Sequence, residues 1–343
     1  MPDAKQFVWW ALGRTSCALI SIAAVACSGG SADAQLKGKV RVDGSSTVAP
    51  ITMAASEMFK AKQPNVEVTV GISGTGGGFK KFLDEKPELR TDISDASRPI
   101  MPQEIKRAQE LGVEFIELPI ALDGLAVVVH PSNTFCDHLT IDELRRIWEP
   151  NSQIKSWSQV RKGFPDKPLT LYGPGTDSGT FDYFTEVIVG KAKASRSDYT
   201  ASESDNMLVR GVEGDQAALG YFGFSYFEAN KSKLRAVPID GGGGKPIVPS
   251  LETVRSGAYA PLSRPLFLYV NKAACSKPAV KAFVEFLLAD TKKIVEHPRV
   301  NYVALSDELS ELARKRFVEG KSGSAMSQAE GAHVDLADTF RKY

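Results

Sequence analysis

The sequence predicts an α/β protein, on two observations. From about residue 38 onward, short runs rich in β-branched residues alternate with segments whose apolar residues recur at helical spacing. The 343-residue chain is also 43% hydrophobic and 24% charged, which is enough apolar material for two domain cores of about 100–200 residues each. The predicted strands cover residues 40–43, 66–70, 92–96, 115–120, 125–129, 169–172 and 266–270.

The segments between these strands carry the signals of amphipathic helices. Apolar stripes begin at Ile51, at Phe79 and at Val280, with the following apolar residues three or four positions apart. Thr140 and Glu143 form a capping box, which predicts a helix that starts at the next residue. Each predicted helix therefore has one apolar face to pack against a sheet.

Charge and cysteine content exclude several classes of function. The net charge of +1 argues against a nucleic-acid binder, which normally carries a basic patch. Cys136 and Cys275 lie in the predicted mature chain, where we expect two separate small buried residues, although an oxidising compartment permits a disulfide. No Cys/His spacing indicates a metal site, so we expect neither a metal nor another cofactor.

The N-terminus reads as an export signal. Lys5 and Arg14 precede a short apolar run, residues 17–27, that is too short to span a bilayer comfortably. Two processing sites compete: cleavage after Ala34, or a lipoprotein junction at which Cys27 is acylated. We favour the lipoprotein, although Ala24 stands where lipoproteins usually carry leucine. Either way residues 1–34 form a leader and tether, and the mature protein is exported.

Four segments share one design, in which the end of a strand is followed by Ser, Thr or Gly and then by the start of a helix. One such segment usually holds a simple N-cap. Four together favour an anion site, because helix N-termini carry free N–H groups and the positive end of the helix dipole. The segments are residues 43–48, 71–78, 96–99 and 177–180.

A catalytic role for Ser178 is the main alternative for the fourth segment. A serine nucleophile needs a base, usually a histidine held by a third group. None of the four histidines lies in a recognisable triad context, and the sequence has neither a Gly-x-Ser-x-Gly elbow nor a phosphate-binding P-loop motif. The sequence therefore predicts a binding protein rather than an enzyme.

Eight sequence blocks in order resemble one family. They are DGSSTVAP, GISGTGGGFKKF, DISDASRPI, DGLAVVVHPSN, LTIDELRRIW, GPGTDSGTFDYFTE, ALGYFGFSYF and PLSRPLFLYVN, and they run from Asp43 to about Val270. Together they resemble the PstS family, the periplasmic phosphate-binding proteins of the bacterial phosphate ABC transporter. The resemblance covers nearly all of the predicted mature chain.

This resemblance implies a type II periplasmic binding protein fold, with two α/β lobes joined by two crossover segments and the ligand in the cleft between them. Lobe one would comprise residues 36–128 plus 266–343, and lobe two residues 129–265. The implied protein is a periplasmic monomer that binds inorganic phosphate and meets the permease subunits of an ABC transporter. It would touch the membrane only through a lipid on Cys27.

The resemblance also implies the phosphate-binding residues, which we carry over by motif. The Gly-rich segment can be aligned in two ways, so it contributes either of two hydroxyl side chains. The set is Ser46, Thr47 and the amide of Val48, then Ser73 or Thr75, then Ser97 and Arg98, and finally Ser178, Gly179 and Thr180.

Two departures from the family pattern bear on the site. Better-known members have an arginine a few residues before Ser-Gly-Thr, where this chain has none, so Arg98 is expected to take over its role. Those members also use a buried aspartate to accept a phosphate proton, and Ser97 stands at the matching position here. Asp95 and Asp177 are near enough to substitute, but strand and capping roles are the favoured explanation for both. Arg264 either reaches the cleft or serves as a structural arginine of the crossover.

Three alternatives therefore stay open at this point. The chain could be a receptor for another tetrahedral oxyanion, such as sulfate, molybdate or arsenate, and a competition panel would separate these. It could sense phosphate or act at the cell surface without any transport role, which uptake measurements would decide. A serine hydrolase would be revived by reaction of Ser178 with a fluorophosphonate probe.

Overall fold

The computed structural model describes residues 36–176, 178–202, 204–328 and 335–343. The predicted leader, residues 1–34 with Cys27, lies outside the described residues, as does Asp177. Among the described helices, none combines the length and the apolar character that crossing a membrane requires.

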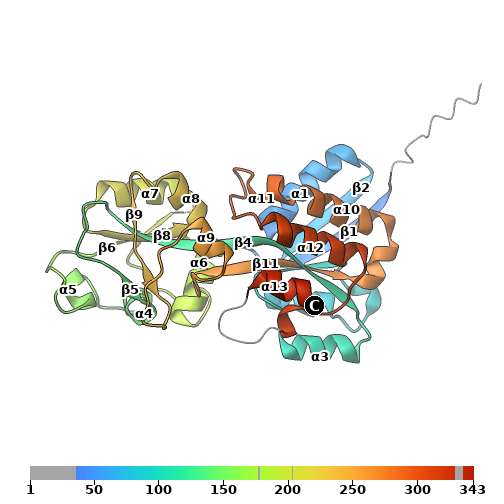
Figure 1. The fold of residues 1–343 in the computed structure, drawn as a ribbon, viewed down its shortest axis with the longest axis horizontal. Helices are drawn as coiled ribbons and strands as arrows, with labels where there is room; N and C mark the ends of the chain where they lie inside the picture. Colours follow the sequence, from blue (N-terminus) through green and yellow to red (C-terminus); the bar gives the residue numbers. More distant parts are fainter. Residues whose placement is uncertain (1–35, 177, 203, 329–334) are drawn as a thin grey trace, which may run out of the picture. The chain divides into compact units, whose positions relative to one another are not determined.

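Within the described ranges, nine strands form one sheet in the order β2-β1-β3-β11-β4-β8-β6-β7, with β9 paired to β4. The two long strands β4 and β11 lie side by side in it (Figure 1). Strands β1, β2 and β3 are mutually parallel, as are β6, β7 and β8. The two parallel groups are joined through β4 and β11, which run antiparallel to each other. The strands are β1 (Gly38–Gly44), β2 (Val66–Ile72), β3 (Ile93–Ala96), β4 (Phe115–Val129), β6 (Thr170–Pro174), β7 (Thr200–Ser202), β8 (Ala218–Gly223), β9 (Arg235–Ala236) and β11 (Ser263–Asn271), with β5 (Leu139–Thr140) and β10 (Ile239–Asp240) paired separately.

Strand β4 replaces the two strands predicted at 115–120 and 125–129. The Asp123–Gly124 dipeptide has the composition of a turn, yet it continues the strand because Asp123 pairs with Arg264 and Gly124 with Ser263 of β11. From Leu125 onward β4 pairs with β8 instead. All fifteen residues of β4 are buried, and the strand connects the two parallel groups.

Helices cover both faces of the first parallel group, and β11 shows how the faces divide. Its residues Leu266, Leu268 and Val270 pack in one cluster with helices α1 and α10, whereas Phe267 and Tyr269 pack in the other cluster with α2. This two-residue alternation is the ordinary consequence of a pleated strand buried on both sides. The strands predicted at 40–43, 66–70, 92–96 and 266–270 are confirmed in position as β1, β2, β3 and β11.

The apolar stripes that begin at Ile51, Phe79 and Val280 lie within helices of the structure. The capping box at Thr140 is confirmed, since the Glu143 amide donates to Thr140 Oγ1 (3.1 Å) and the Thr140 amide to Glu143 Oε2 (2.9 Å). The helices are α1 (Ala49–Lys62), α2 (Thr75–Phe82), α3 (Pro102–Glu110), α4 (Ile141–Trp148), α5 (Trp157–Val160), α6 (Gly179–Phe184), α7 (Asp205–Gly214), α8 (Phe224–Ala229), α9 (Leu251–Arg255), α10 (Pro278–Ala289), α11 (Thr291–Val295), α12 (Asp307–Val318) and α13 (Leu336–Lys342), with a π-helical turn at Thr185–Val189.

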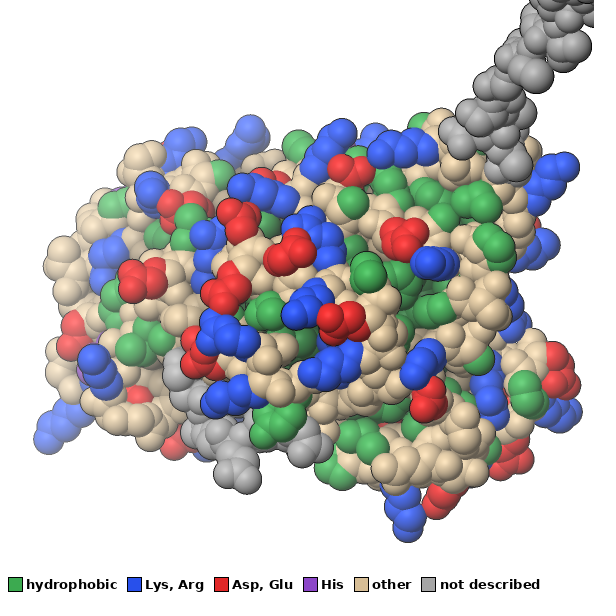
Figure 2. All heavy atoms as spheres, turned by 45° about the vertical axis from the view of Figure 1, so that its right-hand side comes forward, with side chains coloured by type: hydrophobic (Ala, Val, Ile, Leu, Met, Phe, Trp, Pro, Cys, Tyr) green, Lys and Arg blue, Asp and Glu red, His purple; other side chains and the backbone are tan. Residues whose placement is uncertain are grey.

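The surface agrees with the balanced composition. On the face that Figure 2 shows, basic and acidic side chains alternate, with apolar groups between them. Some ion pairs of the described surface are local, such as Arg314 with Glu311, and others join distant segments, such as Lys62 with Asp290. No wide field of one sign is visible on that face.

Candidate functional site

Three of the four predicted segments meet at one edge of the sheet. Because β1, β2 and β3 are parallel, their carboxyl ends lie together, and Gly44 is in register with both Ile72 and Asp95. The carboxyl edge of parallel strands is the usual place for a ligand in an open α/β sheet. Residues 43–48, 71–78 and 96–99 all follow this edge.

The first segment forms the tight entry into α1. Thr47 and Val48 are buried, with exposures of 2% and 0%, and Val48 is the N-cap residue of the helix. The Thr47 amide donates to Ser45 Oγ (3.2 Å). At the start of α1 the Ala49 and Ile51 amides already donate to backbone carbonyls, and Pro50 has no N–H. The predicted donors of this segment are therefore the Val48 amide and the Ser46 and Thr47 hydroxyls.

A glycine allows the second segment to approach the first. A Cβ atom at Gly78 would lie 2.6 Å from Gly44 Cα and 2.9 Å from Ser94 Oγ, distances that no side chain tolerates. Helix α2 can therefore lie against the end of β1 because residue 78 is a glycine. This places the N-terminus of a second helix at the same edge.

The structure distinguishes the two candidate hydroxyl ligands of the Gly-rich segment, Ser73 and Thr75. Thr75 Oγ1 lies 3.1 Å from Ser97 Oγ and accepts from the Ser97 amide at 3.2 Å, so the second and third segments are linked through it. Ser73 instead donates to the Asp43 carboxylate, which also pairs with Lys81. The geometry joins Thr75, and not Ser73, to another predicted ligand.

The fourth segment lies directly against the first. A Cβ atom at Gly179 would be 3.0 Å from both Thr47 Cα and Thr47 Oγ1. Ser178 is the N-cap residue of α6 and its Oγ accepts from the Thr180 amide at 3.2 Å. Ser46 Oγ lies 3.5 Å from Asp182 Oδ2 of the same helix. Residues from opposite parts of the sheet thus form one cluster of hydroxyl and amide donors.

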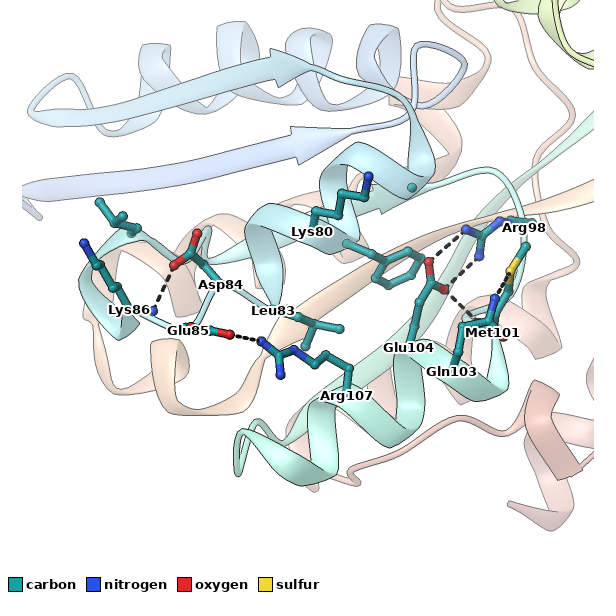
Figure 3. A pocket seen from close by; sticks show the side chains of 13 residues that line it. Lys80, Leu83, Asp84, Glu85, Lys86, Arg98, Met101, Gln103, Glu104 and Arg107 are labelled. Atoms are coloured by element: carbon teal, nitrogen blue, oxygen red, sulfur yellow. Dashed lines mark hydrogen bonds and ion pairs between the residues drawn. The ribbon is translucent and has the colours of Figure 1, made fainter.

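Arg98 is directed away from this cluster. Its two terminal nitrogens each donate to Glu104 at 2.9 Å, and its guanidinium stands 5.5 Å from the Phe79 ring centre. It lines a cavity of about 780 Å³ between α2 and α3 (Figure 3), together with Lys80 and Arg107. Its predicted role as an anion ligand therefore stays a prediction, and in this conformation its donors are taken by Glu104.

The third segment is anchored from behind by a buried polar network. The Ile100 amide donates to the Tyr269 hydroxyl (2.8 Å), which donates to the Glu117 carboxylate (2.7 Å). Ser324 Oγ and the Met326 amide also donate to Glu117. Burial raises the pKa of Glu117, and these hydrogen bonds counter the shift. The network fixes the backbone that follows Ser97.

Arg264 is the arginine that contacts a predicted ligand. It projects from β11, its side chain is 13% exposed, and its Nη2 donates to Thr47 Oγ1 at 3.1 Å. Its guanidinium carbon lies 3.5 Å from the centre of the Tyr183 ring. The sequence left its role open, because nothing local distinguishes a crossover arginine from one that faces a ligand.

Asp95 lies behind the first segment rather than beside its hydroxyl groups. It is fully buried, and its Oδ2 accepts from Thr52 Oγ1 at 2.6 Å. Burial raises the pKa of Asp95 to about 8, against the lowering effect of the Thr52 hydrogen bond, and the Asp43 charge raises it further. A neutral carboxylic acid therefore lies next to the site at neutral pH.

The two cysteines of the described chain do not form a disulfide. Cys136, which is buried, and Cys275, which is half-buried, are both free thiols. Within the described ranges, no three His, Cys, Asp or Glu side chains gather as a metal ion would require.

A family model described as a PBP superfamily domain matches residues 29–291. The chain therefore belongs to the PBP superfamily, the class to which its sheet order and helix-rimmed site already point.

Within that superfamily the chain falls among the SphX and PstS proteins, and the family resemblance seen in the sequence is confirmed. It is 44% identical over 333 residues to Protein SphX of Synechocystis, with 96% of each chain covered. It is 36% identical over 320 residues to the phosphate-binding protein PstS of Staphylococcus haemolyticus, covering 89% of this chain and 97% of that one. A crystal structure of a possible phosphate binding protein from Planctomyces limnophilus is 47% identical, with a TM-score of 0.80 over 83% of this chain and 99% of that one.

Proposed function

We propose that this protein is a substrate-binding receptor that captures inorganic phosphate outside the inner membrane and delivers it to an ABC permease. The observation that carries the proposal is the direct contact between two helix entries from opposite parts of the sheet, Gly179 against Thr47. Relatives named as phosphate-binding proteins support phosphate as the ligand.

The proposed ligands are hydroxyl and amide donors. Ser46, Thr47 and the Val48 amide act from the first segment, and Ser178, Gly179 and Thr180 from the fourth, with Thr75 and Ser97 between them. Neutral donors at helix starts bind a small oxyanion through hydrogen bonds and the helix dipoles. Ser73 and Arg98 stay in the proposed set only for a conformation in which they leave Asp43 and Glu104.

We also propose two lobes, residues 36–128 plus 266–343 and residues 129–265, that close around the anion. The change of partner along β4, from β11 to β8 after Gly124, supports a crossover close to the proposed boundary. Closure of two lobes around a ligand is a common form of domain motion. The protein would act as an exported monomer without catalytic activity, tethered by a lipid on Cys27.

Two experiments test this function. Isothermal titration calorimetry with phosphate, sulfate, arsenate and molybdate is expected to give the tightest binding for phosphate or its close analogue arsenate, and tighter binding of sulfate would refute the assignment. Phosphate uptake in cells that lack the gene is expected to fall and to recover with the wild-type copy. Unchanged uptake would favour sensing or a surface role instead.

A further inference from the structure

Arg264 lies where four separate parts of the chain meet. It projects from β11, donates to Thr47 of the first segment, and stacks on Tyr183 of α6. Its Nε lies 3.5 Å from Asp123 Oδ2, and its Nη1 lies 3.8 Å from Glu186 Oε2. A guanidinium is held in one orientation when an aromatic ring stacks on its face and an acidic residue pairs with its edge.

The hydrogen bonding of this cluster is incomplete. Arg264 Nε and the Asp123 carboxylate are buried and face each other only as a long ion pair, at 3.5 Å, without a hydrogen bond of good geometry. Asp182 Oδ1 is likewise buried without a hydrogen bond and has Lys193 at 3.8 Å. Native structures leave few such groups, and a concentration of them at one place indicates a polar ligand or water. A guanidinium has five N–H donors, and among the described residues one of them, to Thr47, forms a hydrogen bond.

The hydrogen bond from Arg264 to Thr47 determines what the Thr47 hydroxyl can do next. Thr47 Oγ1 accepts from Arg264, so the single proton of the hydroxyl is available to donate elsewhere. Thr47 is one of the proposed ligands and lies against Gly179. An anion that accepts from Thr47 Oγ1 would therefore be within reach of the neighbouring guanidinium N–H groups.

We propose that Arg264 supplies the positive charge of the anion site, presented from the crossover strand β11 and oriented by Tyr183 and Asp123. This inference rests on the proposed function and names a residue for it. Arg98 does not compete for the role in this conformation, because its donors form a bidentate pair with Glu104. A cation on the crossover strand that contacts both Thr47 and Tyr183 of α6 would favour the closed arrangement whenever an anion is bound.

The test compares phosphate affinity among wild type, Arg264→Gln and Arg264→Lys by calorimetry at low and high ionic strength. Charge-assisted hydrogen bonds are stronger than neutral ones, so we expect Arg264→Gln to weaken binding at least tenfold and Arg264→Lys to weaken it less. The wild-type affinity should also fall more steeply with salt than that of Arg264→Gln. The matched control is Arg235→Gln, a half-buried arginine on β9 that bonds backbone carbonyls, and it should stay within about twofold of wild type.

The outcomes separate the two proposals. If wild type binds phosphate and Arg264→Gln binds equally well, or if Arg98→Ala loses more affinity than Arg264→Gln, the inference is wrong and the proposed function stands. If wild type does not bind phosphate, both are wrong. Should the Arg264 variants fail to fold, a crystal structure of wild type with phosphate decides: a guanidinium nitrogen within about 3 Å of a phosphate oxygen supports the inference, and a longer separation refutes it.

Discussion

Replacing Asp95 by asparagine should change how the stability of the fold depends on pH. Burial holds the pKa of Asp95 at about 8, whereas its ordinary value is 3.8. Between these two pH values the folded protein keeps a proton that the unfolded chain has released. Stability therefore falls as the pH rises through this window, by about 1.4 kcal/mol per pH unit for this one group. From pH 5 to pH 7 the loss is about 2.5 kcal/mol.

The assay is urea unfolding of wild type and Asp95→Asn in phosphate-free buffer at pH 5, 6 and 7. An asparagine carbonyl still accepts from Thr52, and any constant penalty of the new amide cancels in the slope. The difference in unfolding free energy, wild type minus variant, should fall by about 2.5 kcal/mol over this range. Thr52→Val is the matched control, since it keeps the carboxyl and should keep the slope. If the unfolding free energies of wild type and Asp95→Asn change in parallel with pH, the folded protein does not hold a proton on Asp95 over this range.

Three further substitutions test the site and its support. Gly179→Ala places a Cβ atom 3.0 Å from Thr47, so phosphate affinity measured by calorimetry should fall at least about tenfold, or 1.4 kcal/mol. Thr75→Val removes the hydroxyl that joins Ser97 and should weaken phosphate binding by about 0.5–1.5 kcal/mol, while Thr75→Ser should restore most of it. Tyr269→Phe leaves a buried amide and a buried carboxylate without their shared partner and should lower the unfolding free energy in urea by about 1–3 kcal/mol.

Each of these has an outcome that would contradict it. Gly214→Ala is the control for the glycine substitution, because a Cβ atom there meets nothing within 4 Å, and equal affinities for both alanine variants would exclude the close approach at Gly179. Full affinity of Thr75→Val would remove that hydroxyl from the site. An unchanged urea midpoint for Tyr269→Phe would mean that the network behind the third segment contributes nothing to stability.

Local sequence patterns predicted the first parallel group and its helices because they reflect local causes, but they did not predict β7 or the central strand β8. The capping box at Thr140 and the apolar stripe at Val280 each fix a helix through neighbours three or four residues away. The continuity of β4 was not predictable in this way. Asp123–Gly124 has the composition of a turn, and only its pairing with Arg264 and Ser263, about 140 residues later in the chain, keeps it extended.

The candidate site could be predicted from the sequence to about the same extent as the fold. Hydroxyl and glycine residues at helix starts identified all four segments, because those residue types serve the exposed amides of a helix N-terminus. Which hydroxyl of the Gly-rich segment faces Ser97, and which arginine faces Thr47, depend on contacts between distant segments. Arg98 is adjacent in sequence to Ser97, another predicted ligand. Its guanidinium forms an ion pair with Glu104 in the first turn of α3, and the sequence motif alone does not reveal this pairing.

The most direct test of the whole account is calorimetric titration of the purified mature chain with phosphate and, separately, with sulfate. We expect one phosphate to bind per chain with higher affinity than sulfate, and binding to be lost when the Ser46, Thr47 and Ser178 hydroxyls are removed together. No phosphate binding, or sulfate bound more tightly than phosphate, would contradict it.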